Sequence, residues 1–139
     1  MIYLGLITLM DNFLYIIVGI ILILFLLRIL IKIRVWSRRG KPAPDVGGQL
    51  GRMIQKGDKV LAYFYSPTCR ACKTQEKYFP IIQKRFNNII RINTAKDRDI
   101  ALSFGVMGTP TVVVIDRGVI KDYFVGITPS NKILKSLNS

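Results

Sequence analysis

The hydrophobic and polar residues of this chain form two contrasting patterns, one in the first 35 positions and one in the rest. Residues 13–27 form an unbroken apolar run, and with Arg28 inside it the apolar segment continues to about residue 33. A helix needs about 20 mostly apolar residues to cross a bilayer. The pattern therefore predicts one transmembrane helix that begins after Asp11 and Asn12, with Arg28 near enough to its end to reach the headgroups.

Two other kinds of segment share this composition. A helix buried in a soluble core would need a larger protein around it, because the rest of this chain is too small to enclose so uniformly apolar a helix. A cleaved signal peptide carries a basic start and a small-residue cleavage site, and this sequence shows neither. We therefore expect a retained, single-pass membrane anchor.

After residue 48, short apolar runs alternate with polar breaks. Their periodicity and the turn residues predict helices at 49–55, 69–86, 97–104 and 128–137, and strands at 59–65, 89–93, 111–116 and 119–125. We expect Pro80 to kink the second helix, Arg117-Gly118 to form a hairpin turn, and Thr128-Pro129 to cap and start the last helix. Alternating helices and strands that end in a hairpin predict an α/β fold.

The composition between these two patterns predicts a connection. Residues 40–48 are rich in proline and glycine, which is typical of a linker that is stiff at first and then flexible. The expected organisation is therefore an apolar segment and transmembrane anchor at residues 1–35, a basic and Pro/Gly-rich linker at 36–48, and a folded domain at 49–139.

The charges of the chain are strongly unbalanced. Lys and Arg number 21 against 8 Asp and Glu, while half of the residues are apolar, a combination that fits a membrane-attached protein. Six basic residues lie at and after the end of the predicted span, and no Lys or Arg lies before it: Arg28, Lys32, Arg34, Arg38, Arg39 and Lys41. Positive residues near a span stay cytoplasmic, so we expect the folded domain in the cytoplasm, with the extracytoplasmic face as the alternative. These charges should meet membrane lipids rather than nucleic acid.

Chemistry is indicated by two cysteines, Cys69 and Cys72, which are the only ones in the chain. They follow a predicted buried strand and open a predicted helix, where unpaired backbone N–H groups favour a thiolate. Cys69 is then the exposed nucleophile, and Cys72, one helical turn deeper, can attack the mixed disulfide and resolve it. The sequence contains no histidine, which excludes Cys-His catalysis and histidine-ligated metals.

A second motif lies downstream, Met107-Gly108-Thr109-Pro110-Thr111, directly before an apolar run. Together with the Cys-x-x-Cys pair it resembles the thioredoxin family over residues 46–139. The resemblance implies a thioredoxin-like fold, in which Pro110 is the cis-proline that packs against the disulfide and Thr109 offers backbone hydrogen bonds to a bound client. Cis peptide bonds are nearly confined to X-Pro, so Thr109-Pro110 is an admissible place for one.

The chain also departs from the thioredoxin pattern. Thr68 stands where the family usually has tryptophan, and Arg70-Ala71 replace Gly-Pro between the cysteines. Arg70 adds a cation that should favour the Cys69 thiolate. Tyr63 stands where the family has a buried aspartate that handles the proton of the second cysteine, and a phenol is a poor base near neutral pH. Lys73 and bound water are then the remaining helpers.

The function expected from these features is that of a membrane-tethered thiol–disulfide oxidoreductase without a cofactor. It would act on a cysteine-containing protein client, most naturally a membrane-associated one, and exchange electrons with a redox partner protein. In the cytoplasm the pair would rest as a dithiol and act as a reductant or isomerase. Two alternatives stay open: a redox-silent interaction or assembly module, and a site for Cu(I), or for Zn²⁺ shared by two chains, although no third protein ligand is predicted.

Overall fold

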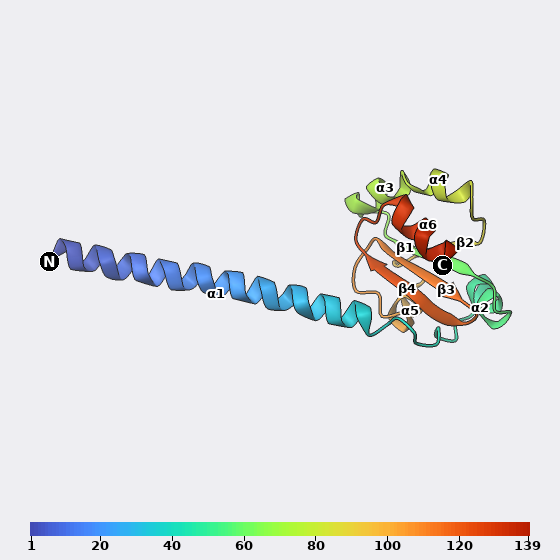
Figure 1. The fold of residues 1–139 in the computed structure, drawn as a ribbon, viewed down its shortest axis with the longest axis horizontal. Coiled ribbons are helices and arrows are strands. Elements are labelled where there is room, and N and C mark those ends of the chain that lie inside the picture. The colour runs from blue at the N-terminus through green and yellow to red at the C-terminus, as the bar shows by residue number, and fades with distance from the viewer. The chain divides into compact units, whose positions relative to one another are not determined.

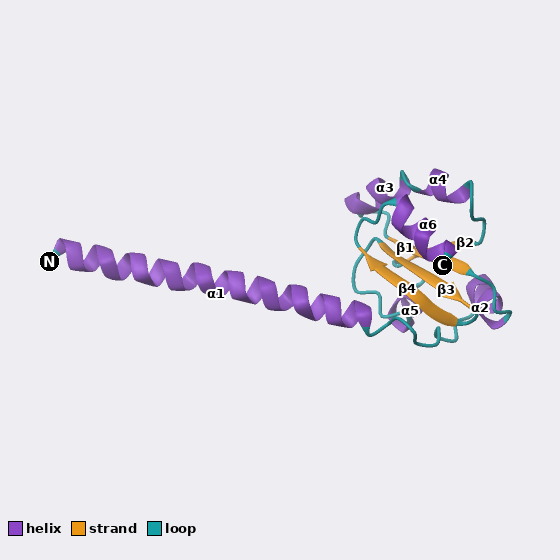
Figure 2. Cartoon of the chain, viewed as in Figure 1, coloured by secondary structure: helices purple, strands orange, loops and turns teal.

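The computed structural model describes the backbone of residues 1–139 and the side chains of all of them except residues 2 and 4–9. The chain divides into two compact units, Met1–Arg34 and Val35–Ser139. Ten helices and strands are drawn in Figure 1 and are distinguished by type in Figure 2.

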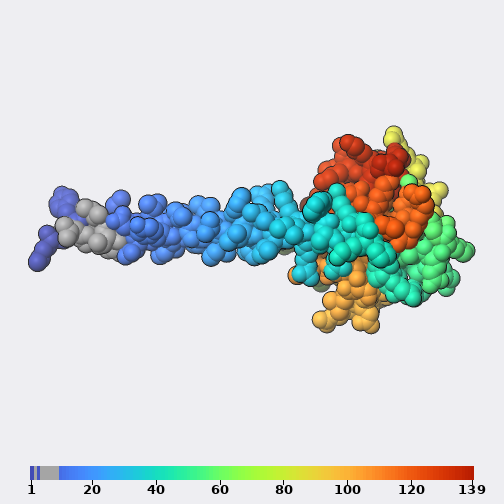
Figure 3. All heavy atoms as spheres, turned by 60° about the horizontal axis from the view of Figure 1, so that its bottom comes forward, coloured from blue at the N-terminus to red at the C-terminus, as the bar shows by residue number. Residues whose placement is uncertain are grey.

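The apolar segment belongs to a single helix, α1 (Ile2–Trp36). It begins well before the predicted start, because Asp11 and Asn12 continue the helix instead of interrupting it. Polar residues can be accommodated in a helix when their side chains face solvent, and both are exposed here. Residues 10–36 of α1 are long and apolar enough to cross a membrane. Their apolar side chains between positions 13 and 33 are each at least 37% exposed. Figure 3 draws the heavy atoms of this segment as blue spheres.

The second unit is built on a mixed sheet of four strands, β1 (Val60–Tyr65), β2 (Ile89–Asn93), β3 (Thr111–Asp116) and β4 (Val119–Val125). Their order in the sheet is β2-β1-β3-β4. β1 is parallel to β2, while β1 with β3 and β3 with β4 are antiparallel. Arg117 (φ 50°) and Gly118 (φ 73°) form the tight turn between β3 and β4, as the sequence predicted.

Helices cover both faces of this sheet. One face packs against α2 (Gly48–Gln55) and α5 (Arg98–Ser103), and the other against α4 (Phe79–Gln83) and α6 (Ser130–Asn138), with α3 (Arg70–Glu76) beside α4 (Figure 1). Alternate residues of β1 supply the two cores, since successive strand side chains point to opposite faces. Ala62 and Phe64 face the first core, and Leu61 and Tyr63 face the second.

The helix predicted over residues 69–86 is instead two short helices, α3 and α4, so the prediction of one kinked helix was wrong. The break lies at Lys77 and Tyr78, directly before Phe79-Pro80. A proline has no N–H to donate and its ring collides with the carbonyl four residues earlier, so Pro80 is tolerated only in the first turn of a new helix. Phe79 and Ile82 of that new helix are fully buried.

The predicted cap of the last helix was also wrong. The N-cap residue of α6 is Pro129, and the helix begins at Ser130 without a capping side chain. The Thr128 hydroxyl donates a hydrogen bond to the carbonyl of Gly126 at 3.2 Å instead, within the loop that precedes the helix.

Part of the stretch predicted as a linker is bound to the sheet. The Gly40 N–H donates to the Ile120 carbonyl at 2.8 Å, the Ile120 N–H to the Lys41 carbonyl at 2.9 Å, and the Ala43 N–H to the Gly118 carbonyl at 2.8 Å. Residues 40–43 thus lie antiparallel along the start of β4. Arg39 pairs with Asp122 of β4 at 3.1 Å. This strap of residues 39–43 covers an edge strand that would otherwise expose unpaired backbone groups.

Candidate functional site

The cysteine pair lies where the chain leaves β1. Ser66-Pro67-Thr68 turns the backbone after the strand, and the Cys69 N–H donates to the Ser66 carbonyl at 3.1 Å. Cys69 has extended backbone angles and is the N-cap residue of α3. A residue at this position can accept hydrogen bonds from the free N–H groups of the first helical turn. The sequence thereby brings a sulfur atom to the end of a buried strand.

The two cysteines are joined by a disulfide, with their Cα atoms 5.3 Å apart. Cys72 is 3% exposed, whereas Cys69 is partly exposed. The Cys72 N–H donates to Cys69 Sγ at 3.1 Å. A hydrogen bond to the charged form of a group stabilises that form, so the same N–H would stabilise a thiolate at Cys69 after reduction.

The Thr109–Pro110 peptide bond is cis, as the resemblance implied. The Thr109 carbonyl oxygen lies 3.4 Å from Cys69 Sγ, so the two motifs recognised in the sequence meet in space. The Pro110 carbonyl accepts a hydrogen bond from the Gly126 N–H at 2.8 Å, which joins this segment to the loop between β4 and α6. The disulfide therefore lies beside the loop that carries the cis-proline, and that loop is joined in turn to the loop after β4.

Tyr63 is fully buried, and its hydroxyl donates a hydrogen bond to the Cys72 carbonyl at 3.3 Å. Its ring lies 4.5 Å from that of Phe79 and 5.7 Å from that of Tyr65, measured between centroids. Burial raises the pKa of Tyr63 to about 12, with a smaller contribution from the Glu76 carboxylate. The phenol is thus neutral and serves as a hydrogen-bond donor at physiological pH, which agrees with its being a poor base.

The other charged residues predicted for the site lie at its surface. Arg70 and Lys73 on α3 are both exposed, so solvent screens their charges. Glu76, one turn further, pairs with Arg91 of β2 at 3.6 Å. Arg70 and Lys73 therefore lie on α3, the helix that carries Cys72. Among the described residues, the structure shows no contact between either side chain and a sulfur atom.

Sequence reasoning missed Gln75, which is fully buried on α3. Its amide oxygen accepts from the Thr128 N–H at 2.7 Å, and its amide nitrogen donates to the Thr128 carbonyl at 3.0 Å. Spacing could have indicated it, because Gln75 lies three residues after Cys72 and four before Phe79, on the buried side of the helix.

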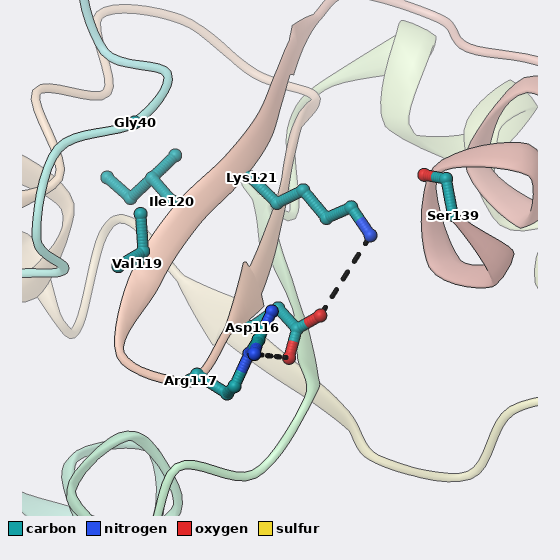
Figure 4. Close-up of a pocket in the computed structure, with 7 residues that line it drawn as sticks. All are labelled: Gly40, Asp116, Arg117, Val119, Ile120, Lys121 and Ser139. Atoms are coloured by element: carbon teal, nitrogen blue, oxygen red, sulfur yellow. Dashed lines mark ion pairs between the residues drawn. The ribbon is translucent and has the colours of Figure 1, made fainter.

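Two surface hollows lie near the ends of β3. One, of about 320 Å³, adjoins Thr109 and is lined mainly by apolar residues of α5 and the following loop: Thr94, Arg98, Ala101, Leu102, Val106, Met107, Gly108 and Thr109. The other, of about 700 Å³, lies at the opposite end of β3, at the hairpin turn (Figure 4). There the Asp116 carboxylate meets Lys59 at 3.3 Å and Lys121 at 3.9 Å. No cysteine lines either hollow.

Within the side chains that the structure describes, no group of three or more Cys, His, Asp or Glu residues is arranged to hold a metal ion. The cysteine pair can supply two thiolates, which is half of a tetrahedral zinc site.

A mixed sheet, a disulfide at the start of the helix after β1, and a cis X-Pro bond whose flanking carbonyl touches the first sulfur define a class of protein, the thiol–disulfide oxidoreductases. The chain belongs to the thioredoxin family, whose family model matches residues 48–139. The cysteine pair and this membership together support thiol–disulfide oxidoreductase activity.

Known thioredoxins agree with this assignment. The chain is 27% identical over 93 residues to a thioredoxin of Mycoplasma genitalium, covering 66% of this chain and 91% of that one. It is 27% identical over 82 residues to a thioredoxin of Bacillus subtilis, covering 57% and 79%. A solved structure of a mutant thioredoxin from Halobacterium salinarum is similar with a TM-score of 0.58 and 26% identity, over 69% of this chain and 91% of that chain.

Proposed function

We propose that this protein is a membrane-tethered thiol–disulfide oxidoreductase that uses Cys69 as nucleophile and Cys72 as resolving thiol on a cysteine-containing protein client. The observation that supports this assignment most directly is the hydrogen bond from the Cys72 N–H to Cys69 Sγ, combined with the burial of Cys72 and the partial exposure of Cys69. The accessible sulfur is the one whose thiolate the backbone stabilises.

In the reducing direction the exchange has two steps. The Cys69 thiolate attacks one sulfur of a client disulfide, forming a mixed disulfide and releasing the client's other sulfur as a thiolate. The Cys72 thiolate then attacks Cys69 Sγ, which forms the Cys69–Cys72 disulfide and frees the second client thiol. Two electrons pass to the client, and a redox partner protein restores the dithiol. The Thr109 backbone, 3.4 Å from Cys69 Sγ at its carbonyl, would hold the client's main chain beside Pro110.

Neither step uses Tyr63 as a base, since its pKa is raised and its hydroxyl already donates to the Cys72 carbonyl. Water is the group left to take the proton of Cys72, and the exposed ammonium of Lys73 can favour the resulting thiolate only through its positive charge. Arg70, equally exposed, would favour the Cys69 thiolate weakly because solvent screens its charge.

The tether in this proposal is α1. Its candidate span, Met10–Trp36, is 27 residues long, and none of its most apolar stretch is buried, so the apolar side chains of that stretch need a lipid environment. The strap begins at Arg39 and is bound to β4 from Gly40 onward. The four steps from Trp36 to Gly40 can span at most about 14 Å. The domain would therefore be held close to the membrane, and clients would be proteins of the same membrane.

The domain organisation of the proposal keeps the anchor at residues 1–35, the connection at 36–48 and the redox domain at 49–139, with residues 39–43 of the connection bound to β4 of that domain. The six basic residues at and after the end of the apolar segment favour a cytoplasmic domain, where they would meet the lipid headgroups. Labelling intact cells with a membrane-impermeant thiol reagent after mild reduction tests the orientation. We expect Cys69 to react only after permeabilisation, and rapid labelling of intact cells would place the domain outside.

The roles of the cysteines are tested by trapping. Cys72→Ser should accumulate mixed disulfides through Cys69, because the resolving thiol is missing, and Cys69→Ser should accumulate none. Equal trapping by both variants would contradict the assigned roles. A complete absence of exchange by the wild-type chain would favour a redox-silent interaction module.

A further inference from the structure

A fully buried polar side chain, that of Gln75, lies three residues after Cys72. Both polar atoms of its amide bond to the backbone of one residue, Thr128. Thr128 is itself only 4% exposed. Buried polar groups cost free energy unless they are paired, so the amide and the loop backbone satisfy each other.

The loop that Gln75 holds connects β4 to α6 and is bound at two points. At one, the Gly126 N–H donates to the Pro110 carbonyl, one residue from the Thr109 oxygen that touches Cys69 Sγ. At the other, Thr128 is bound to Gln75 on α3, the helix that carries Cys72. Between the two points lies Ile127, whose side chain is 48% exposed.

An exposed isoleucine on a loop bound at both sides is suited to contact a partner. Apolar surface gains free energy when a partner covers it, and a fixed loop loses little conformational freedom when that happens. A leucine at position 75 would fill the same space but would leave the Thr128 N–H and carbonyl without their partner.

We propose that Gln75 is a positioning residue that fixes Ile127 as an apolar contact for the client segment beside its cysteine. This inference deepens the proposed function and depends on it. The substrate class it names is a protein disulfide with an apolar residue next to the reacting cysteine. A small disulfide without a peptide chain does not reach Ile127, so its reduction does not depend on the loop that Gln75 holds in place.

Steady-state kinetics with two substrates test the proposal, using the full chain in detergent micelles with dithiothreitol as the reductant that restores the Cys69–Cys72 dithiol, and with the uncatalysed rate subtracted. The substrates are insulin, a protein disulfide, and hydroxyethyl disulfide, a small one. Gln75→Leu should raise KM for insulin about tenfold with kcat little changed, because loss of the two hydrogen bonds releases the loop. Its rate with hydroxyethyl disulfide should equal that of the wild type.

Two further variants separate positioning from stability. Leu50→Ala removes a buried side chain of α2 in the core on the other sheet face, so it destabilises the fold without touching the loop, and its insulin KM should not change. Ile127→Ser alters an exposed residue and should raise the insulin KM by itself. In the Gln75→Leu background it should add little, because the contact is already lost.

An unchanged insulin KM in Gln75→Leu or in Ile127→Ser would overturn the proposal, as would fully additive effects in the double variant. Equal losses with insulin and hydroxyethyl disulfide would also overturn it, because they would indicate a general structural role. Failure of the wild-type chain with both substrates would instead reject the proposed function.

Discussion

The side chains of α1 and those of the central strands β1 and β3 are chemically alike but meet opposite surroundings. In α1, Ile, Leu and Phe between residues 13 and 33 are at least 37% exposed, whereas the residues of β1 from Val60 to Phe64 are fully buried. The strands are covered by helices on both faces, while the most apolar stretch of α1 is not buried at all. Apolar content alone therefore does not define a core, and what covers the apolar surface decides its role.

The segment that connects these regions shows that composition alone does not define a linker either. Residues 35–43 are rich in basic residues, yet Val35 and Ala43 pack against the core formed with α2 and α5, and Arg39 pairs with Asp122. A segment whose composition indicates a linker is thus part of the domain surface, because its backbone groups find partners on β4.

The largest expected effect comes from removing residues 1–34. The remaining chain should leave the membrane fraction completely and still reduce a soluble disulfide, because the disulfide and both cores belong to the second unit. Fractionation together with an insulin reduction assay checks both parts. Continued membrane association of the shortened chain would show that another surface binds lipid, and the contrast between the two regions would then be smaller than described.

A matched pair of phenylalanines tests burial directly. Phe64→Ala in β1 should lower the free energy of unfolding of the domain by about 3–5 kcal/mol, since that ring is fully buried. Phe25→Ala in α1, where the ring is 60% exposed, should change it by less than about 0.5 kcal/mol. Denaturant titration in detergent measures both. Similar losses in the two variants would contradict the assignment of Phe25 to a lipid-facing surface.

Tyr63 gives a pH-dependent test of the buried region. Its pKa is raised from 10.0 to about 12 in the folded state, so the fold favours the neutral phenol. This contribution is complete below pH 10 and is lost as the pH rises through 12, by about 1.4 kcal/mol per unit. The free energy of unfolding should therefore fall less between pH 9 and pH 11 in Tyr63→Phe than in the wild type. Parallel curves for the two proteins would rule out this role.

The smallest expected effect concerns the strap. Ala43→Pro removes the N–H that donates to the Gly118 carbonyl and should destabilise the domain by about 1 kcal/mol. Ala43→Gly keeps that N–H and is the control. Amide exchange at Gly40 and Ile120 should accelerate only in the proline variant. If exchange there is already at the rate of an unfolded chain in the wild type, residues 40–43 behave as a free linker.

Much of the fold follows from local patterns in the sequence. The bounds of β2, β3 and β4 match the predicted strands, because polar or turn residues interrupt the apolar runs at both ends of each strand. The division of α3 from α4 was harder to foresee, because apolar residues recur at helical spacing on both sides of Pro80. The strap and Gln75 depend on partners more than 50 residues away, Gly118 to Ile120 and Thr128, and no local pattern encodes such contacts.

The candidate site, too, could be predicted from the sequence only in part. The two cysteines and Thr109-Pro110 could be paired from their motifs, and the structure places Cys69 Sγ 3.4 Å from the Thr109 carbonyl oxygen. The orientation of the Tyr63 hydroxyl toward the Cys72 carbonyl follows from the packing of its ring against Phe79, which no motif contains.

The central claim is that α1 holds a working Cys69–Cys72 pair at a membrane, and one rate comparison tests it most directly. The full chain, reduced beforehand, is placed in lipid vesicles, and insulin attached to a lipid headgroup is placed either in the same vesicles or in separate ones. We predict reduction at least about tenfold faster in shared vesicles, because the common membrane raises the effective concentration, and no reduction by Cys69→Ser. Equal rates in shared and separate vesicles, or activity that survives Cys69→Ser, would contradict the account.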